Sequence, residues 1–357
     1  MQIGLVGLPL SGKTTFFNLL TETAQKTGLS TSGRTHVGTA LVPDHRVDFL
    51  SRLYQPHKTT YAQIQFKDIR GFMPGTAQGK TMGLDEVRSC DALVLVVRAF
   101  HSDLIDDSVG EPHPYKEVLD CCAEFLLADM AMVENRIARL ENMPKPPKDA
   151  DAQLTLLKHV LSALEEEIPL NQIDMGSPGT ESLDKNEFLT SKPLILAVNV
   201  DEEELETGEY PQRDELIRYA ADRDIEVIED CGLVEMEISQ LPRDERAEFM
   251  AHYNLTETGI DRLARAAYAS LGLIAFFTVG EDEVRAWTVR RGTPAKKAAG
   301  KIHSDIERGF IRAEVFAYEA LHEHGSALKV KEKGLFRLEG KEYIILDGDI
   351  VSFRFNV

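Results

Sequence analysis

A short glycine-containing segment near the start of the chain has the spacing of a phosphate-binding loop. Gly7 and Gly12 are separated by four residues, and Lys13 and Thr14 follow directly. Glycines at these positions let backbone N–H groups wrap a β-phosphate, and the helix that follows presents its positive N-terminus. Lys13 is expected to bridge β- and γ-phosphate oxygens, and the Thr14 hydroxyl to ligate Mg²⁺. The apolar residues 2–7 predict the strand that this motif requires.

The same loop supplies most of the predicted nucleotide contacts. A glycine turn without a ligand is the alternative interpretation. The position of the segment between a predicted strand and a predicted helix argues against that alternative. From this loop, the residues expected to bind nucleotide are Leu10, Ser11, Gly12, Lys13, Thr14 and Thr15.

An acidic motif follows the next predicted strand. Residues 61–67 include alternating apolar and polar side chains, and Asp68 and Gly71 come next in the pattern Asp-x-x-Gly. In phosphate-binding-loop proteins an aspartate here holds Mg²⁺ through water, and a glycine amide contacts the γ-phosphate. Acidic turns are common, so the motif alone does not indicate a site. Its distance along the sequence from the phosphate-binding loop is what supports a functional role. We predict Lys13, Asp68 and Gly71 as catalytic residues, and Thr14 and Asp68 as magnesium ligands.

A third motif concerns the nucleotide base. The apolar run 194–198 leads into Asn199, Val200 and Glu202, where GTPases carry Asn-Lys-x-Asp. That aspartate accepts two hydrogen bonds from guanine, and glutamate is one methylene too long for the same register. A carboxylate is also a poor partner for the ring-nitrogen acceptor of adenine, so backbone groups or Asn199 would have to read adenine. The residues thus argue for lost guanine selectivity more firmly than for adenine. A solvated acidic helix start is the alternative for 201–204.

These motifs require a sheet that brings several strand ends together. The continuous apolar runs at 92–97 and 194–198 are typical of strands buried on both faces, and 226–228 predicts a short further strand. Strands that alternate with helical segments predict an α/β fold, a doubly wound and mostly parallel sheet of the P-loop NTPase class. We expect this domain to comprise residues 1–114 and 190–272.

A helical insertion separates two of the strands. Apolar residues recur every three or four positions across 119–140, a proline-rich break occupies 143–147, and the stripe resumes over 154–168. This pattern predicts two amphipathic helices in an antiparallel hairpin, a coiled coil, within residues 115–189. The stripe is expected to be the packing seam of the two helices. An arm that meets a partner is the alternative.

The last part of the chain is rich in strand-forming residues and turns. Asp347 and Gly348 separate two apolar runs, a pattern that predicts a β-hairpin. We expect a compact, largely β domain over 273–357. Within it, residues 290–301 hold five cations and no acid. This basic stretch is either a solvated loop or a contact for RNA phosphates.

In this order, the motifs resemble the YchF/Obg-like ATPase family of translation-factor-class P-loop NTPases, over nearly the whole chain. The resemblance is closest at 283–289, 298–303 and 307–314, which are similar to a TGS domain. That domain is a ubiquitin-like β-grasp module linked to RNA and ribosome binding. The resemblance therefore implies a β-grasp C-terminal domain, a ribosome or RNA partner, and adenine as the base with a backbone contact at Val200.

The loop and the first switch depart from the family pattern. Leu10 and Ser11 stand where the family has Asn-Val. A Val-Pro-Asp sequence ends the first switch, and counting back from it places Ser32 at the position of a further magnesium ligand. Thr31 and Thr35 lie close to that position, so they are alternatives for this role.

Two other segments also differ from the family. Cys231 and Gly232 begin the segment that replaces a Ser-Ala-Lys-like loop, and they are the residues expected at that base contact. Some members use a histidine in the loop after the third strand. Here Asp106 and Asp107 stand near that place, and His101 lies earlier. His101 is therefore either a water-orienting base or, as we expect, a surface histidine.

The residue after Gly71 bears on turnover. It is Phe72, where many GTPases have a glutamine that orients the attacking water, and phenylalanine cannot donate to or accept from water. We therefore predict slow basal hydrolysis of MgATP, raised by K⁺, a partner or a ribosome. The alternatives are a nucleotide-gated scaffold with negligible turnover and an NTPase that prefers GTP.

Composition limits the remaining function classes. The net charge of −19 argues against a protein that coats nucleic acid through its whole surface, but residues 272–357 carry 14 basic and 13 acidic side chains. No apolar stretch approaches the roughly 20 residues that span a bilayer. Four cysteines fit neither a disulfide framework nor a zinc site, and the N-terminus lacks the pattern of a secretory signal. We expect a cytoplasmic protein without a membrane partner; its oligomeric state is left open.

Overall fold

A computed structural model describes residues 1–23, 35–69, 84–101, 110–173, 187–253 and 255–356. The chain divides into two compact units. The first comprises residues 1–38 and 65–263, and the second residues 39–64 and 264–357. The second unit therefore includes residues 39–64 and 264–272 in addition to the range 273–357 expected from the sequence.

The first sheet confirms the predicted doubly wound, mostly parallel architecture. Its strand order is β2-β4-β1-β5-β6-β7, and β1, β4, β5, β6 and β7 pair in parallel. All seven residues of β5 are buried, as its continuous apolar run predicts. The strands are β1 (Gln2–Val6), β2 (His36–Val42), β4 (Ala62–Asp68), β5 (Ala92–Arg98), β6 (Leu194–Asn199) and β7 (Glu226–Asp230).

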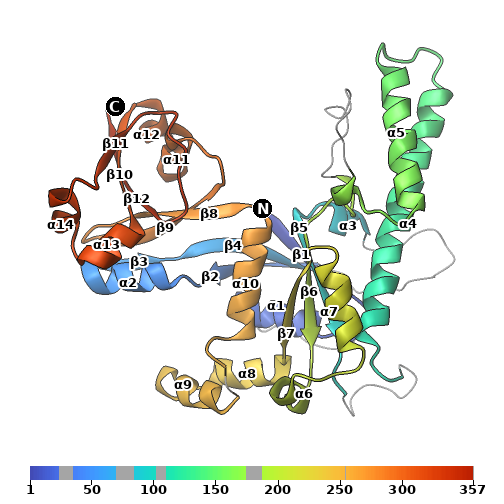
Figure 1. Cartoon of the computed structure of the whole chain (residues 1–357), viewed down its shortest axis with the longest axis horizontal. Helices are drawn as coiled ribbons and strands as arrows, with labels where there is room; N and C mark the ends of the chain where they lie inside the picture. Colours follow the sequence, from blue (N-terminus) through green and yellow to red (C-terminus); the bar gives the residue numbers. More distant parts are fainter. Residues whose placement is uncertain (24–34, 70–83, 102–109, 174–186, 254, 357) are drawn as a thin grey trace. The chain divides into compact units, whose positions relative to one another are not determined.

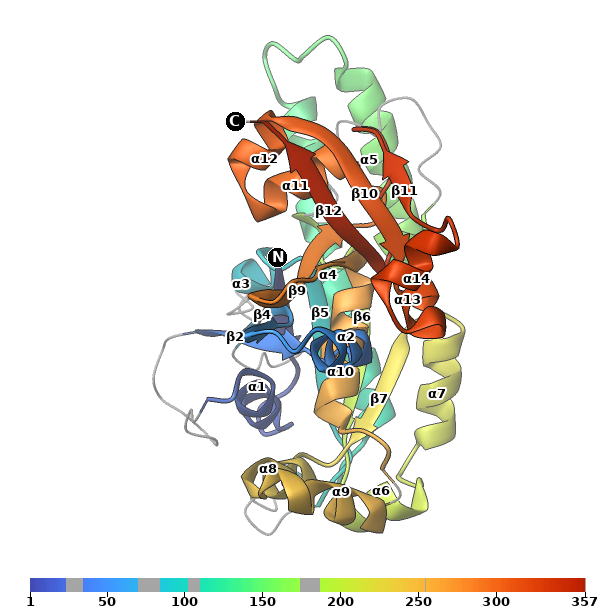
Figure 2. The ribbon, with the colours of Figure 1, turned by 90° about the vertical axis from the view of Figure 1, so that its left-hand side faces the viewer.

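Helices flank this sheet, and Figure 2 shows α1 and α7 on its opposite sides. They connect the strands in the alternating order that the sequence predicts. The short helices of this part of the chain are α1 (Lys13–Thr21), α3 (Leu84–Arg88), α6 (Glu202–Thr207), α7 (Arg213–Ala221), α8 (Gly232–Gln240), α9 (Arg243–His252), α10 (Gly259–Ser270) and a single 3₁₀ turn at Leu170–Gln172. Among the described residues, no helix combines the length and the apolar character needed to cross a membrane.

The predicted helical hairpin consists of α4 (Pro114–Glu141) and α5 (Ala150–Glu165), which run side by side in Figure 1. Their apolar stripes form the packing seam, where Val133, Leu157 and Val160 are almost fully buried.

A buried carboxylate fastens the hairpin to the rest of the first unit. Asp129 of α4 is fully buried and accepts hydrogen bonds from the backbone N–H groups of Leu189 (3.1 Å) and Thr190 (2.8 Å) and from the Thr190 hydroxyl (2.9 Å). The Arg88 guanidinium, at the end of α3, is 3.0 Å from the same carboxylate. Four donors on one carboxylate offset the cost of burying its charge.

The second unit contains a six-stranded mixed sheet in the order β11-β10-β12-β8-β9-β3. Its edge strand β3 comes from early in the chain and pairs in parallel with β9, Lys58 opposite Glu283. The elements of this unit are α2 (His45–Tyr54), β3 (Lys58–Thr60), β8 (Leu273–Thr278), β9 (Glu283–Arg290), α11 (Ala295–Ile302), α12 (Ser304–Arg308), β10 (Phe310–Ala317), α13 (Tyr318–His324), α14 (Ala327–Glu332), β11 (Arg337–Glu339) and β12 (Asp349–Phe355).

An arginine of α2 ties the early segment into the second unit. The Arg46 guanidinium donates to the carboxylates of Asp44 (2.8 Å) and Asp347 (2.9 Å), and it lies over the Phe277 ring at 5.1 Å from the centroid. A planar guanidinium suits this combination of two carboxylates and an aromatic face. Residues 39–64 are thereby held to the C-terminal sheet by side chains as well as by β3.

The predicted hairpin at Asp347 and Gly348 is wrong. Strand β12 begins at Asp349, but residues 341–346 make only an isolated bridge from Ile344 to Pro294. Strand β12 pairs instead with β10 and β8, and the Asp347 carboxylate accepts a hydrogen bond from the backbone N–H of Ala275 at 2.9 Å. The local pattern marked the turn correctly, but distant strands supplied the partners.

Candidate nucleotide-binding site

The predicted phosphate-binding loop links the end of β1 to α1, and its backbone needs glycine at two positions. Gly7 has φ +143° and Gly12 has φ +97°. A Cβ atom on Gly7 would lie 2.2 Å from the Val96 carbonyl oxygen, and one on Gly12 would lie 2.2 Å from Asn199 Nδ2. Both the torsion angles and the close approach of neighbouring atoms exclude a side chain here. The backbone of the loop therefore explains why both positions of the motif are glycine.

Lys13 is folded back onto this loop. Its ammonium group donates to the carbonyl oxygens of Leu8 (2.6 Å) and Gly7 (3.1 Å), and the side chain is buried. Burial lowers the pKa of Lys13 to about 8, although the Asp68 carboxylate acts in the opposite direction. Among the described residues, no carboxylate is hydrogen-bonded to the Lys13 ammonium group, whose partners are two carbonyl oxygens.

The two predicted magnesium ligands meet at the end of β4. The Thr14 hydroxyl donates to Asp68 Oδ2 at 2.9 Å, and burial raises the pKa of Asp68 against the opposing effects of Thr14 and Lys13. Asp68 reaches this place because β4 pairs in parallel with β1, Leu5 opposite Asp68. A hydroxyl beside a carboxylate is the oxygen donor set that Mg²⁺ prefers, so these residues fit the ion.

Asn199 ties the loop to the start of α8. Its side-chain amide donates to the Ser11 carbonyl oxygen at 3.2 Å, and its Oδ1 accepts from the backbone N–H of Gly232 at 3.1 Å. The residue is buried at the end of β6. Thr15 approaches the same junction, since a Cβ atom on Gly232 would lie 3.3 Å from its methyl group. Asn199 therefore positions two predicted contact segments against each other.

Glu202 and Val200 are also engaged by protein groups. The Tyr253 hydroxyl donates to Glu202 Oε1 at 2.7 Å, and this bond raises the pKa of Tyr253 to about 12. The backbone N–H of Val200 donates to the Asp230 carbonyl oxygen at 3.0 Å, so the Val200 carbonyl is the backbone group left to contact a base. Sequence reasoning missed Tyr253, because it lies 51 residues from Glu202.

The alternative interpretation of 201–204 also has support. Asp201 caps α6, accepting from the backbone N–H of Glu204 at 2.9 Å, while the Glu204 carboxylate accepts from the backbone N–H of Asp201 at 3.0 Å. This is a capping box, in which both side chains serve the helix start. Asp201 and Glu204 thus have a structural role.

A buried pair of carboxyl groups flanks Cys231 and Gly232 in the sequence, Asp230 directly before them and Glu235 three residues after Gly232. Asp230 and Glu235 are almost fully buried, and Glu235 Oε1 accepts from the backbone N–H of Gly259 at 2.6 Å. Burial raises the pKa of both groups, and their mutual repulsion adds to the rise for Asp230. Burial also raises the pKa of the Cys231 thiol. Sequence reasoning missed this pair, because Asp230 is one of three acidic residues in β7, together with Glu226 and Glu229, and nothing in the pattern marks it as the buried one.

Some of the remaining predicted residues lie outside the part of the chain that the structure describes, and others lie within it. Gly71, Ser32, Thr31, Phe72, Asp106 and Asp107 lie outside the described residues. Thr35 is described, and its hydroxyl donates to the Glu86 carboxylate of α3. His101 is exposed, with Nε2 2.8 Å from Glu111 Oε2 and Nδ1 3.9 Å from Asp201 Oδ2. Its partners belong to the protein surface and the α6 cap, in keeping with a surface histidine.

Comparison with known proteins gives one consistent family. Residues 273–356 match the domain family YchF-GTPase_C, described as a protein of unknown function (DUF933). The chain is 40% identical to the ribosome-binding ATPase YchF of Bacillus subtilis (strain 168), over 100% of both chains. It is 36% identical to the protein of that name from Escherichia coli O157:H7, covering 100% of this chain and 99% of the relative.

Eukaryotic proteins show the same similarity. The chain is 34% identical to Obg-like ATPase 1 of Caenorhabditis elegans, covering 100% of this chain and 92% of the relative. The solved structure of the Schizosaccharomyces pombe YchF GTPase superposes with a TM-score of 0.85 at 27% identity, covering 99% of this chain and 97% of that one.

Proposed function

The chain belongs to the YchF family, and from this membership we propose that it is a Mg²⁺-dependent nucleoside triphosphatase that binds and slowly hydrolyses ATP. The observation that carries the proposal is the arrangement of Lys13, Thr14 and Asp68 around a loop with two obligatory glycines. The loop offers backbone donors, a cation and two oxygen ligands within one short stretch of surface, which is what a Mg²⁺-bound triphosphate requires.

Each group has a defined task in this proposal. Lys13 exchanges its two carbonyl partners for phosphate oxygens, and the negative charge raises its pKa so that it stays protonated. Thr14 and Asp68 would hold the ion, Asp68 through water, and Ser32 would be a further ligand. When bound there, the ion would supply positive charge that neutralises the phosphate oxygens of the nucleotide. The Gly71 amide contacts the γ-phosphate, and turnover is slow because Phe72 cannot orient water.

Adenine is the proposed base. Glu202 accepts from Tyr253 and is one methylene longer than the guanine-binding aspartate, so it is poorly placed to accept two bonds from guanine. The Val200 carbonyl can accept from the exocyclic amine of adenine, an interaction that guanine cannot provide at that position. Gly232 and Cys231 line the proposed base contact with Asn199. ATPase relatives support this choice, whereas the name of the fission-yeast protein, a GTPase, supports the alternative of GTP.

Parallel titrations test base choice and nucleotide binding together. Fluorescent ATP and GTP analogues and their diphosphates are titrated into the full chain with and without Mg²⁺. We expect tighter binding of the adenine nucleotides and a loss of affinity when Mg²⁺ is removed. Tighter binding of GTP would establish the GTP-preferring alternative. Equal affinity with and without Mg²⁺ would show that Thr14 and Asp68 do not act as magnesium ligands.

The ribosome is the proposed macromolecular partner, because bacterial relatives are ribosome-binding proteins. In the basic stretch, Arg290, Arg291, Lys296 and Lys301 are exposed, whereas Lys297 is paired with Glu307 at 2.7 Å. Exposed cations on a rigid helix and strand end suit contacts with RNA phosphates. We also propose a cytoplasmic location, where ribosomes are available.

Co-sedimentation with ribosomes tests this surface. Reversing Arg290 and Lys296 to glutamate should release the protein from ribosomes at lower salt than the unchanged chain, because two phosphate contacts are lost. Reversing Lys329 and Lys331 on α14, which are also exposed, is the matched control. Equal loss in both variants would show non-specific attraction only, and no loss in either would exclude the basic stretch.

A scaffold with negligible turnover is the second candidate function. It is favoured by Phe72, which leaves the water-orienting role without an evident side chain. In that case nucleotide binding would control partner binding without release of phosphate. Added K⁺ or ribosomes should stimulate an ATPase and leave a scaffold unchanged.

A further inference from the structure

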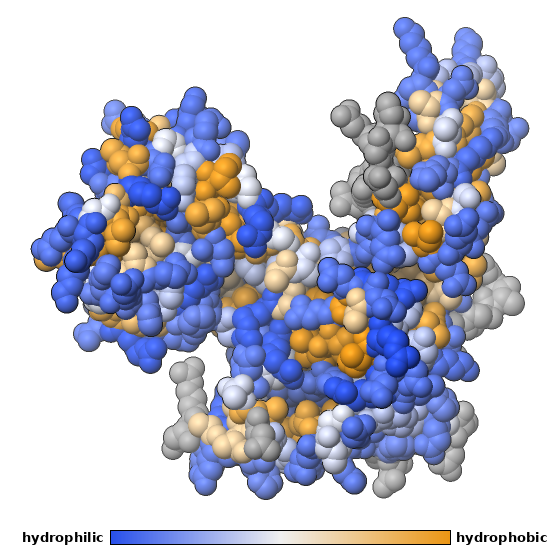
Figure 3. All heavy atoms as spheres, viewed as in Figure 1, coloured by the Kyte–Doolittle hydropathy of each residue, from blue (hydrophilic) through white to orange (hydrophobic). Residues whose placement is uncertain are grey.

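The outer end of the helical hairpin contains a cavity of about 330 Å³ between α4 and α5. Leu140 and Met143, from the end of α4 and the connection, face Leu156 and Leu157 of α5 across it. Leu156 and Leu157 are buried, whereas Leu140 and Met143 are half-buried, so the cavity has an apolar floor that reaches the surface. On the face that Figure 3 shows, apolar and hydrophilic surface alternate along the hairpin.

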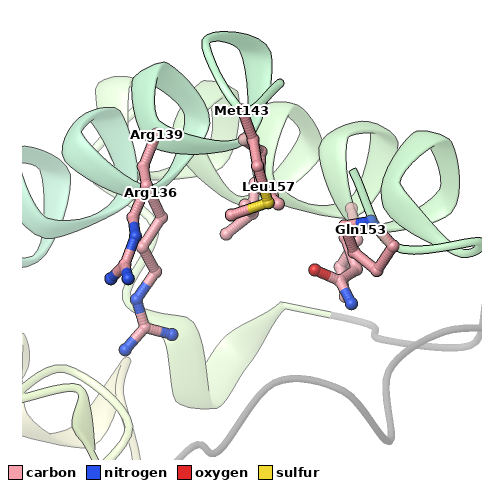
Figure 4. Close-up of a pocket in the computed structure, with 8 residues that line it drawn as sticks. Arg136, Arg139, Met143, Gln153 and Leu157 are labelled. Atoms are coloured by element: carbon pink, nitrogen blue, oxygen red, sulfur yellow. The ribbon is translucent and has the colours of Figure 1, made fainter. Parts of the chain in front are cut away.

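Two arginines form one end of the cavity. Arg136 and Arg139 extend in the same direction from α4, and Gln153 lies at the other end, with Met143 and Leu157 between them (Figure 4). Arg136 is held in place by an ion pair with Glu187 and by the Phe188 ring, 5.2 Å below its guanidinium.

The second arginine differs from the first. Arg139 is exposed and has no ionic or hydrogen-bond partner among the described residues. One guanidinium is thus fixed and neutralised, while its neighbour remains available to a carboxylate.

The local charge contrasts with that of the chain. Residues 136–148 carry four basic side chains and one acidic side chain, whereas Asp149 accepts from Gln153 at the other end of the cavity and Asp151 follows. A carboxylate is therefore attracted to the Arg139 end of the cavity and not to the Gln153 end. The floor consists of aliphatic side chains and a methionine, which adapt to aliphatic groups. No aromatic ring lines the cavity among the described residues, so it lacks the stacking platform on which nucleic-acid bases bind.

We propose that this cavity binds a peptide segment of a partner protein in which a carboxylate stands next to a bulky aliphatic side chain. The aliphatic side chain fills the space over Leu140, Met143, Leu156 and Leu157, and the carboxylate pairs with Arg139. An open cavity at the end of a helical hairpin suits a side chain that projects from another protein, because it leaves room for the backbone of the partner outside. The proposal goes beyond nucleotide hydrolysis and does not depend on it.

Peptide arrays and the full-length chain provide the test. One array contains short peptides that combine Asp or Glu with Leu, Ile or Met in all orders. A second replaces the acids by Lys, and a third replaces the aliphatic residues by Ser. We expect binding on the first array alone. The best binder is then labelled, and its affinity is measured by fluorescence anisotropy.

Variants separate the cavity from general attraction. Arg139→Glu should lower the affinity for the labelled peptide by about tenfold or more, and Met143→Ser should lower it by several-fold. Arg218→Glu, which reverses another exposed arginine on α7, and Leu127→Ser, which removes an exposed leucine of α4, should leave affinity unchanged. All four positions are exposed or half-buried, so the variants are expected to fold, which circular dichroism checks.

Three results would overturn the proposal. The first is no preference for the acidic-aliphatic array, and the second is an equal loss of affinity in Arg218→Glu. The third is displacement of the peptide by single-stranded oligouridylate whose own affinity falls as strongly in Arg139→Glu, which would identify a nucleic-acid site instead.

Discussion

At the scale of single residues, Lys13 and Asn199 show how the candidate site is assembled before any ligand arrives. Lys13 is held by two loop carbonyls, and Asn199 holds the loop to the start of α8. The sequence identified both residues by their motifs. It did not reveal that Asn199 is occupied with protein groups, because those partners lie 188 and 33 residues away.

Lys13 predicts a proton linkage to nucleotide binding. Without a phosphate its pKa is lowered to about 8 by burial, so the side chain loses its proton as pH rises through that value. Bound phosphate raises the pKa, and binding above about pH 8 must therefore take up protons. Calorimetry in buffers of different ionisation enthalpy should show an uptake that grows from about pH 7.5 to about pH 9, towards one proton. An uptake that does not change, or a release, would contradict the burial of Lys13.

Asn199 predicts a combined loss of stability and affinity. Asn199→Asp replaces the donor that faces the Ser11 carbonyl by an oxygen, so one hydrogen bond becomes a repulsion in a buried site. We expect destabilisation of about 2 kcal/mol in urea unfolding and weaker nucleotide binding. Asn135→Asp on exposed α4 is the matched control and should change neither. An unchanged Asn199→Asp variant would show that this tie is not needed.

At the scale of elements, periodicity predicted the parallel strands and the helical hairpin well. Strands buried on both faces and helices with one apolar stripe are encoded by adjacent residues, as β5 and α5 illustrate. Partners of elements are not encoded in this local way. Strand β3 joins a sheet whose other strands begin more than 200 residues later, and Asp347 marks a turn without a hairpin. The buried pair of Asp230 and Glu235 was missed because the start of α10, which packs against both side chains at Gly259, follows more than 20 residues later.

The hairpin depends on a side chain that no helical pattern predicts. Asp129→Asn keeps the shape of the side chain, but its amide NH₂ group would lie against backbone N–H donors. The substitution also leaves Arg88 without its charge partner. We expect a cost of about 3 kcal/mol, because the group is fully buried. Hydrogen exchange should show faster opening of α4 and the neighbouring residues 187–190. Glu134→Gln, on the exposed side of α4, serves as control, and equal protection in both variants would contradict the anchoring role.

At the scale of the whole molecule, charge and chemistry are unevenly distributed. Residues 272–357 carry a net charge of +1, so the remainder of the chain carries −20. The motifs for phosphate, metal and base all belong to the first unit, and the basic stretch proposed for the ribosome belongs to the second. This division of labour fits a protein in which one unit binds nucleotide and the other meets a large anionic partner.

The proposed ATPase activity is tested most directly by multiple-turnover release of phosphate from MgATP and MgGTP by the full chain, with K⁺ and with ribosomes added separately. We expect slow release from MgATP, slower release from MgGTP, and loss of both in Lys13→Ala, since that variant removes the cation of the loop. No release from the unchanged chain under any of these conditions, or equal release by Lys13→Ala, would contradict the proposed activity.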